Sequence, residues 1–170
     1  FGGDPAAVTV GGQSAGAWYA WLLGASPAAR GLLQRNLLLS MPVVPPMSAQ
    51  ELAQTCEHIM QGVSERSFDA LTTEEVLLRQ DALMRSRVRF GEVPLGLRPA
   101  VEEGLVPPWL LDFGHAARQA HVSQTLLGTT AEEATAFLFE NPAATDASES
   151  TVRAWYEGQF GSRAGPVHDA

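Results

Sequence analysis

The sequence predicts an α/β fold with a parallel sheet. Three short apolar segments, at residues 6–10, 35–41 and 122–130, have the length and composition of buried strands. Helical segments separate them along the chain, and this alternation is typical of parallel strands with helices on both faces. With 170 residues, of which 45% are hydrophobic, the chain can form one sizeable core or part of a larger one.

The first strand, "AAVTV" at residues 6–10, leads into the glycine-rich turn "GGQSAG". After this turn, residues 15–25 continue without a helix breaker. Trp18, Trp21 and Leu22 recur there at spacings of three and four, which predicts a helix packed against an apolar surface.

Capping signals mark two helices in the middle of the chain. Ser48 with Glu51, and Thr72 with Glu75, have the spacing of capping boxes. Cys56 is the single cysteine, so no disulfide can form within the chain, and it falls on the apolar stripe of the first of these helices. We therefore expect it to be a small core residue.

Two more segments complete the predicted organisation. Residues 91–115 are rich in glycine and proline and predict a long irregular loop, and "DASE" at residues 146–149 begins a last helix. The helices between the second and third strands form a helical insertion in the α/β pattern.

The composition excludes several classes of partner. A net charge of −8 argues against nucleic acid, because phosphate binding needs a basic surface. No apolar run approaches the roughly 18 residues that a membrane-spanning helix requires. No cluster of metal-ligand residues is recognisable, so we expect neither a metal nor an organic cofactor.

The turn after the first strand contains the pattern G-x-S-x-G, with Ser14 at its centre. A nucleophilic serine needs a sharp strand-to-helix turn, and Gly12 and Gly16 would let the strand and the helix approach each other. The amide of Ala15, at the start of the helix, could donate to a developing oxyanion. The alternative is an ordinary glycine-rich turn, but the strand before it and the helix after it favour a nucleophile.

Longer segments resemble the type-B carboxylesterase (cholinesterase and carboxylesterase) family. "FGGDPAAVTVGGQSAGA" is similar to the family's nucleophile segment, F-G-G-D-P-x-x-V-T-x-x-G-x-S-A-G-A. "SPAARGLLQRNLLLSM" resembles the family's S-P-x-x-x-G-L-F-x-R-A-I-x-Q-S-G, and "RPAVEEG" resembles its P-V-V-D-G turn. "LLGTTAEEATAFL" resembles the segment that carries the acid of the catalytic triad, V-G-x-N-x-D-E-G-x-x-F.

This resemblance implies a partial α/β-hydrolase fold, with residues 1–170 as the central fragment of a single domain. It implies a serine hydrolase that acts on small-molecule carboxylic esters through an acyl-enzyme, without a cofactor. Ser14 matches the nucleophile, Ala15 one oxyanion-hole donor and Glu133 the triad carboxylate. Glu132 is the neighbouring competitor, but the family pattern places the acid at the second position.

The triad also needs a histidine, and the family order is serine, acid, histidine. His58, His115 and His121 precede Glu133, and only His168 follows it. The family has a longer segment between acid and base, so we expect the base to lie beyond residue 170 and not at His168. The isolated chain is then expected to be inactive. The alternative function is a catalytically inactive, esterase-like domain for binding or adhesion.

Overall fold

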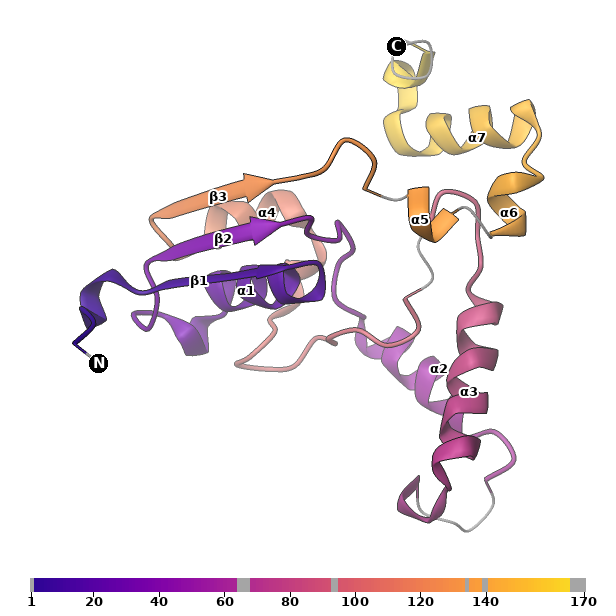
Figure 1. Ribbon diagram of the computed structural model, residues 1–170, viewed down its shortest axis with the longest axis horizontal. Helices are drawn as coiled ribbons and strands as arrows, with labels where there is room; N and C mark the ends of the chain where they lie inside the picture. The colour runs from indigo at the N-terminus through magenta and orange to yellow at the C-terminus, as the bar shows by residue number, and fades with distance from the viewer. Residues whose placement is uncertain (1, 64–67, 93–94, 134, 139–140, 166–170) are drawn as a thin grey trace. The chain divides into compact units, whose positions relative to one another are not determined.

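A computed structural model describes residues 2–63, 68–92, 95–133, 135–138 and 141–165 (Figure 1). The chain divides into two compact units, and each is considered by itself. The first unit comprises Phe1–Glu57 and Leu97–Glu133, and the second comprises His58–Gly96 and Ala134–Ala170. Ser14 and Glu133 both belong to the first unit.

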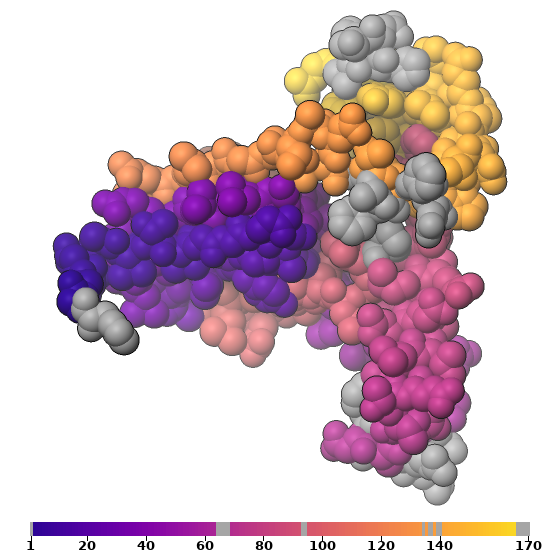
Figure 2. All heavy atoms as spheres, in the orientation of Figure 1, coloured from indigo at the N-terminus to yellow at the C-terminus, as the bar shows by residue number. Residues whose placement is uncertain are grey.

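The first unit is built on a parallel three-stranded sheet, which confirms the predicted fold class. Strands β1 (Thr9–Gln13), β2 (Arg35–Leu39) and β3 (Gln124–Gly128) lie in the order β1-β2-β3. Gln13 pairs with Leu39, and Leu39 pairs with Gly128, so the three strands end at the same edge. Their atoms form adjacent indigo, purple and orange bands in the space-filling view (Figure 2).

Strand β1 begins and ends later than the sequence predicts. Residues 5–7 form a 3₁₀ turn instead of the start of the strand, and Asp4 caps it by accepting a hydrogen bond from the Ala6 amide at 2.8 Å. The strand instead extends through Gly11 and Gly12 to Gln13. Pairing with β2 outweighs the low strand propensity of glycine at these positions.

Helix α1 (Ala15–Ala25) packs on β1 and β2, as its apolar spacing predicts. Ala17 and Ala20 are buried against Leu38 of β2. Leu22 and Ala25, near the other end of the helix, belong to a second buried cluster. The helix therefore runs back along the sheet from the edge where the strands end.

Part of the predicted loop at residues 91–115 is helical, so that prediction is wrong in its second half. Residues Pro108–Leu111 form the 3₁₀ helix η4, and α4 spans Phe113–Gln119. Asp112 caps α4 by accepting the His115 amide at 2.9 Å. Leu110 and Ala116 supply the rest of the cluster at the end of α1, so tertiary packing stabilises this short helix.

Helix α2 (Ala49–Met60) begins at the predicted capping box. The Ser48 amide donates to Glu51 at 2.7 Å, and the Glu51 amide donates to the Ser48 hydroxyl at 3.2 Å. The prediction for Cys56 is wrong, because this residue is exposed. The neighbouring Thr55 is the buried one, and its hydroxyl donates to the Glu51 carbonyl at 2.7 Å.

The second unit is helical in its described residues. Helix α3 (Thr73–Ser86) has the predicted capping box, in which the Thr72 amide donates to Glu75 at 2.7 Å. Phe90 and Trp155 pack edge to face, with ring centroids 6.0 Å apart.

The remaining elements in the described part of the chain are η2 (Pro27–Ala29), η3 (Phe68–Ala70), α5 (Thr135–Leu138), α6 (Pro142–Thr145), α7 (Glu149–Phe160) and η5 (Gly161–Arg163).

None of the helices in the described ranges has both the length and the apolar character needed to cross a membrane.

Candidate active site

Ser14 lies in the turn between the last residue of β1 and the first residue of α1. Its backbone has φ 54° and ψ −121°, a conformation that a residue with a Cβ rarely adopts. Two hydrogen bonds hold it there: the Ser14 amide donates to the Leu39 carbonyl at 2.9 Å, and its own carbonyl accepts the Trp18 amide at 3.1 Å. The Ser14 hydroxyl makes no capping hydrogen bond to α1, so it is not required to stabilise the start of that helix.

The two glycines that flank Ser14 play different structural roles. A Cβ on Gly12 would lie 2.3 Å from the carbonyl carbon of Gly16 and 2.7 Å from the Ala17 nitrogen. Only glycine therefore allows β1 and α1 to approach so closely. A Cβ on Gly16 would meet none of the described atoms within 4 Å, so the predicted need for glycine holds at Gly12 but not at Gly16.

Ala15 is the first residue of α1 and is exposed. Amides in the first turn of a helix have no acceptor within the helix, and the helix dipole makes that end attractive to negative charge. The Ala15 amide is therefore available next to the Ser14 hydroxyl for an oxygen atom that becomes negative.

Glu133 lies in the loop that follows β3, and its carboxylate accepts several hydrogen bonds. The Thr130 amide donates to Glu133 Oε1. This bond lowers the pKa of Glu133 below its ordinary value, and hydrogen bonds from the Ser40 and Thr130 hydroxyls lower that pKa further, against a smaller opposing effect of burial. Glu133 is exposed and therefore ionised at neutral pH.

The strand register brings these residues to one edge of the sheet. Ser14 follows β1, Ser40 follows β2, and the loop with Glu133 follows β3. Neighbouring strands lie roughly 4.8 Å apart, so the ends of β1 and β3 are separated by about 10 Å.

Sequence reasoning assigned no role to Ser40 or Thr130. Ser40 belongs to a segment that resembles the family, but it falls inside the strand predicted at residues 35–41, and only the observed end of β2 at Leu39 places it in the turn that follows. The contact between Ser40 and Glu133 depends on the pairing of β2 with β3, which no local pattern indicates.

Two of the four histidines lie in the first unit, and both are engaged elsewhere. His121 Nε2 lies 3.0 Å from the Leu23 carbonyl and 3.1 Å from the Ser26 carbonyl, at the C-terminal end of α1. Ser14 precedes the other end of this 11-residue helix, about 16 Å away. His115 stacks on Trp109, with ring centroids 6.0 Å apart, beside the same end of α1.

His58 belongs to the second unit, and His168 lies outside the described residues. The described residues of the first unit therefore bring Ser14, Ala15 and the loop with Glu133 to one edge of the sheet, and neither histidine of that unit lies between them.

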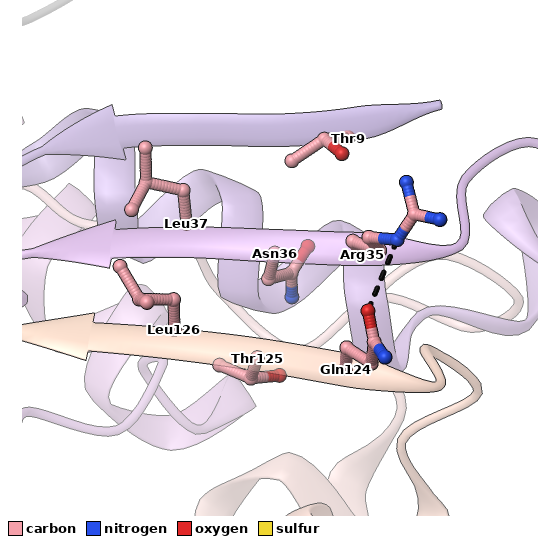
Figure 3. Close-up of a pocket in the computed structure, with 7 residues that line it drawn as sticks. All are labelled: Thr9, Arg35, Asn36, Leu37, Gln124, Thr125 and Leu126. Atoms are coloured by element: carbon pink, nitrogen blue, oxygen red, sulfur yellow. Dashed lines mark hydrogen bonds between the residues drawn. The ribbon is translucent and has the colours of Figure 1, made fainter. Parts of the chain in front are cut away.

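A concavity of about 450 Å³ lies on the sheet, but not at this edge (Figure 3). It is found where the strands begin, where the Arg35 Nε donates to the Gln124 side chain at 3.1 Å. Sites in parallel sheets form at the carboxyl ends of the strands, so we assign no part of the candidate site to this concavity. It is lined by Thr9, Arg35, Asn36, Leu37, Gln124, Thr125 and Leu126.

Comparison with known proteins gives consistent matches over nearly the whole chain. The model of the carboxylesterase family matches residues 1–162. Phenmedipham hydrolase from Pseudarthrobacter oxydans is 27% identical over 174 residues, which cover 100% of this chain and 34% of that protein. Para-nitrobenzyl esterase from Bacillus subtilis is 32% identical over 161 residues, which cover 92% of this chain and 32% of that protein.

Solved structures agree with these sequence matches. A thermophilic PNB esterase superimposes with a TM-score of 0.70 at 28% identity, covering 99% of this chain and 35% of that one. A carboxylesterase from Geobacillus stearothermophilus gives a TM-score of 0.63 at 26% identity, covering 95% and 34%. The chain thus spans about a third of the length of the relatives it matches, and its sheet and helices are part of an α/β-hydrolase fold. The chain belongs to the carboxylesterase family.

Proposed function

We propose that this chain carries the nucleophile and the acid of a serine hydrolase that cleaves carboxylic esters. The observation that carries the proposal is the strained backbone of Ser14, held between β1 and α1 at the edge where Glu133 also lies. The names of the relatives, an esterase for para-nitrobenzyl esters and a hydrolase, support the same reaction class. Because one family match extends across both compact units, we also propose that residues 1–170 form the central part of one α/β-hydrolase domain.

In the proposed mechanism, the Ser14 oxygen attacks the carbonyl carbon of the ester while a histidine takes the hydroxyl proton. The carbonyl oxygen becomes negative and accepts a hydrogen bond from the Ala15 amide. The C–O bond to the alcohol then breaks, the histidine returns the proton to the alcohol, and an acyl-Ser14 ester remains. Water attacks this ester with the histidine again as base, which releases the carboxylic acid and restores Ser14.

Glu133 acts in this mechanism by accepting the other imidazole N–H. Its ionised carboxylate selects the tautomer in which the second ring nitrogen faces Ser14, and it stabilises the imidazolium that forms. The low pKa of Glu133 keeps it charged at the pH at which a histidine can act as a base. His115 and His121 are engaged at the far end of α1, so the base comes from elsewhere in the intact protein.

A fluorophosphonate probe tests the proposal directly, because an activated serine oxygen displaces fluoride and becomes covalently labelled. We expect labelling of the intact protein at Ser14, located by peptide mass spectrometry, and its loss in Ser14→Ala. Glu133→Gln should slow labelling about 10⁴-fold, because a neutral amide favours the wrong histidine tautomer. Ser123→Ala is the matched control, since its hydroxyl only donates to the Gln34 carbonyl at the opposite end of the sheet.

Hydrolysis of para-nitrobenzyl and p-nitrophenyl esters by the same variants then shows whether the protein turns esters over, and not only whether Ser14 reacts with the probe. No labelling of the intact protein at Ser14 would reject the hydrolase and favour the alternative, an esterase-like domain that binds without catalysis. The chain of 170 residues by itself is expected to show little turnover, because both histidines in the described part of the first unit are engaged at the far end of α1. Efficient turnover that disappears in His168→Ala would instead assign the base to His168.

A further inference from the structure

Met41 lies in the turn that follows β2, at the same edge of the sheet as Ser14. Ser40, the residue before it, has φ 48°, so the chain leaves the strand conformation immediately after Leu39. The Leu39 carbonyl accepts the Ser14 amide at 2.9 Å, which ties the turn with Ser14 to the end of β2. Met41 is two residues from Leu39, a separation of at most about 7 Å between their Cα atoms. The turn with Met41 therefore begins beside the turn with the candidate nucleophile.

The side chain of Met41 packs on the side of the sheet that α1 covers. It contacts the buried cluster formed by Ala17 and Ala20 of α1 and Leu38 of β2. Ala17 belongs to the first turn of α1, the same turn that supplies the candidate oxyanion donor. Met41 is half-buried, so the cluster covers only part of this side chain and the rest remains accessible.

Met41 is also a departure from the family's sequence pattern. The corresponding motif of the family ends in Q-S-G, and Met41 stands in place of its glycine. A glycine leaves the space beside the start of α1 open, whereas methionine fills it with a long, unbranched apolar side chain. Apolar side chains around a few polar groups are typical of the walls of ligand sites. The chain thus has additional apolar volume next to the candidate nucleophile.

We propose that Met41 is a specificity-determining residue whose side chain forms a wall of the site and restricts the acyl group of the ester to short chains. The proposal rests on the function proposed above for Ser14. The alcohol must reach the histidine that gives it a proton, whereas the acyl group stays on the carbonyl carbon, next to the oxygen held by the first turn of α1. Because Met41 packs against this part of α1, it meets the acyl group and not the alcohol.

Four substitutions separate the size of this side chain from its packing. Met41→Ala removes the wall, Met41→Val shortens it, and Met41→Leu keeps its volume. Val10→Ala is the matched control, because Val10 packs against the same cluster from β1 but lies four residues before Ser14, about 13 Å along the strand. Met41→Ala and Val10→Ala should both lower the Tm, since both remove contacts with the cluster.

The decisive measurement is kcat/KM of the intact protein for p-nitrophenyl acetate and p-nitrophenyl hexanoate, which differ only in the acyl chain. Met41→Ala should raise the hexanoate-to-acetate ratio of kcat/KM about tenfold or more, because the longer chain gains room. Met41→Val should raise this ratio by less, and Met41→Leu and Val10→Ala should leave it unchanged. Phenyl acetate and 2-naphthyl acetate differ only in the alcohol, and their ratio should stay at the parent value in every variant.

The outcomes distinguish this inference from the function on which it rests. If a fluorophosphonate labels Ser14 of the parent but folded Met41→Ala keeps the parent hexanoate-to-acetate ratio, Met41 is a packing residue only and the inference is wrong. Met41→Val decides the question in the same way if Met41→Ala does not fold. A change in the naphthyl-to-phenyl ratio alone would place Met41 beside the alcohol and overturn the acyl assignment. If Ser14 of the parent is not labelled, the hydrolase proposal itself fails.

Discussion

Replacing Gly12 with alanine should destabilise the first unit, whereas the same replacement at Gly16 should not. The new Cβ of Gly12→Ala would lie 2.3, 2.6 and 2.7 Å from backbone atoms of Gly16 and Ala17. Backbone atoms cannot rotate away, and pairing with Leu38 fixes the strand while packing of Ala17 fixes the helix. Overpacking of this kind costs about 1–3 kcal/mol, which lowers the Tm of a chain of this size by roughly 3–10 °C.

Gly16→Ala is the matched control, because its Cβ would meet no described atom within 4 Å. Alanine inside a helix is more stable than glycine by up to about 1 kcal/mol, so the Tm should rise by about 2–4 °C. Tryptophan fluorescence is a suitable assay, since Trp18, Trp21 and Trp109, three of the four tryptophans, lie in the first unit. Equal stability of the two variants would refute the argument that Gly12 is required by the close approach of β1 and α1.

Three further predictions concern strain, charge and capping. Ser14→Gly should be about 1 kcal/mol more stable than Ser14→Ala and should therefore unfold at a higher temperature, because only glycine relieves the strain at φ 54°; equal melting temperatures would contradict this. Burial raises the pKa of Glu51, but hydrogen bonds from Ser48 and the charge of Arg98, 2.8 Å away, outweigh it and leave that pKa below 4.5. The contribution of Glu51 to the free energy of unfolding is therefore full above pH 4.5 and is lost as the pH falls through the lower pKa of the folded state. Urea unfolding should show that Glu51→Gln costs about 0.5–1 kcal/mol at pH 7 and less near pH 3, and an equal cost at both would disprove the sign. Thr72→Ala should cost about 1 kcal/mol by urea unfolding and Thr72→Ser almost nothing, and a silent Thr72→Ala would exclude a capping role.

The parts of the fold that depend on neighbouring residues were predictable from the sequence. The capping boxes at Ser48 and Thr72 involve residues three positions apart, and both form as predicted. The apolar spacing of α1 likewise predicted the burial of Trp18 and Leu22. These patterns join residues that lie within one or two helical turns of each other, so they can be recognised in the sequence without the tertiary structure.

Predictions that depended on which side of an element meets the core were less successful. Cys56 and Thr55 differ by one position on α2, and the packing of that helix buries the threonine instead of the cysteine. Helix α4 forms because Leu110 and Ala116 pack against the end of α1, although its glycine- and proline-rich surroundings predicted a loop.

The sequence by itself determined the family resemblance, the parallel α/β class and the candidates Ser14, Ala15 and Glu133, because each is written in a short pattern of residues. The tertiary structure decided how those candidates meet. Parallel pairing of three strands brings their ends to one edge, so the turns with Ser14 and Ser40 and the loop with Glu133, which are far apart along the chain, follow strands that end side by side. That arrangement also produces the positive φ angles at Ser14 and Ser40, the close approach of β1 and α1 at Gly12, and the hydrogen bonds to Glu133.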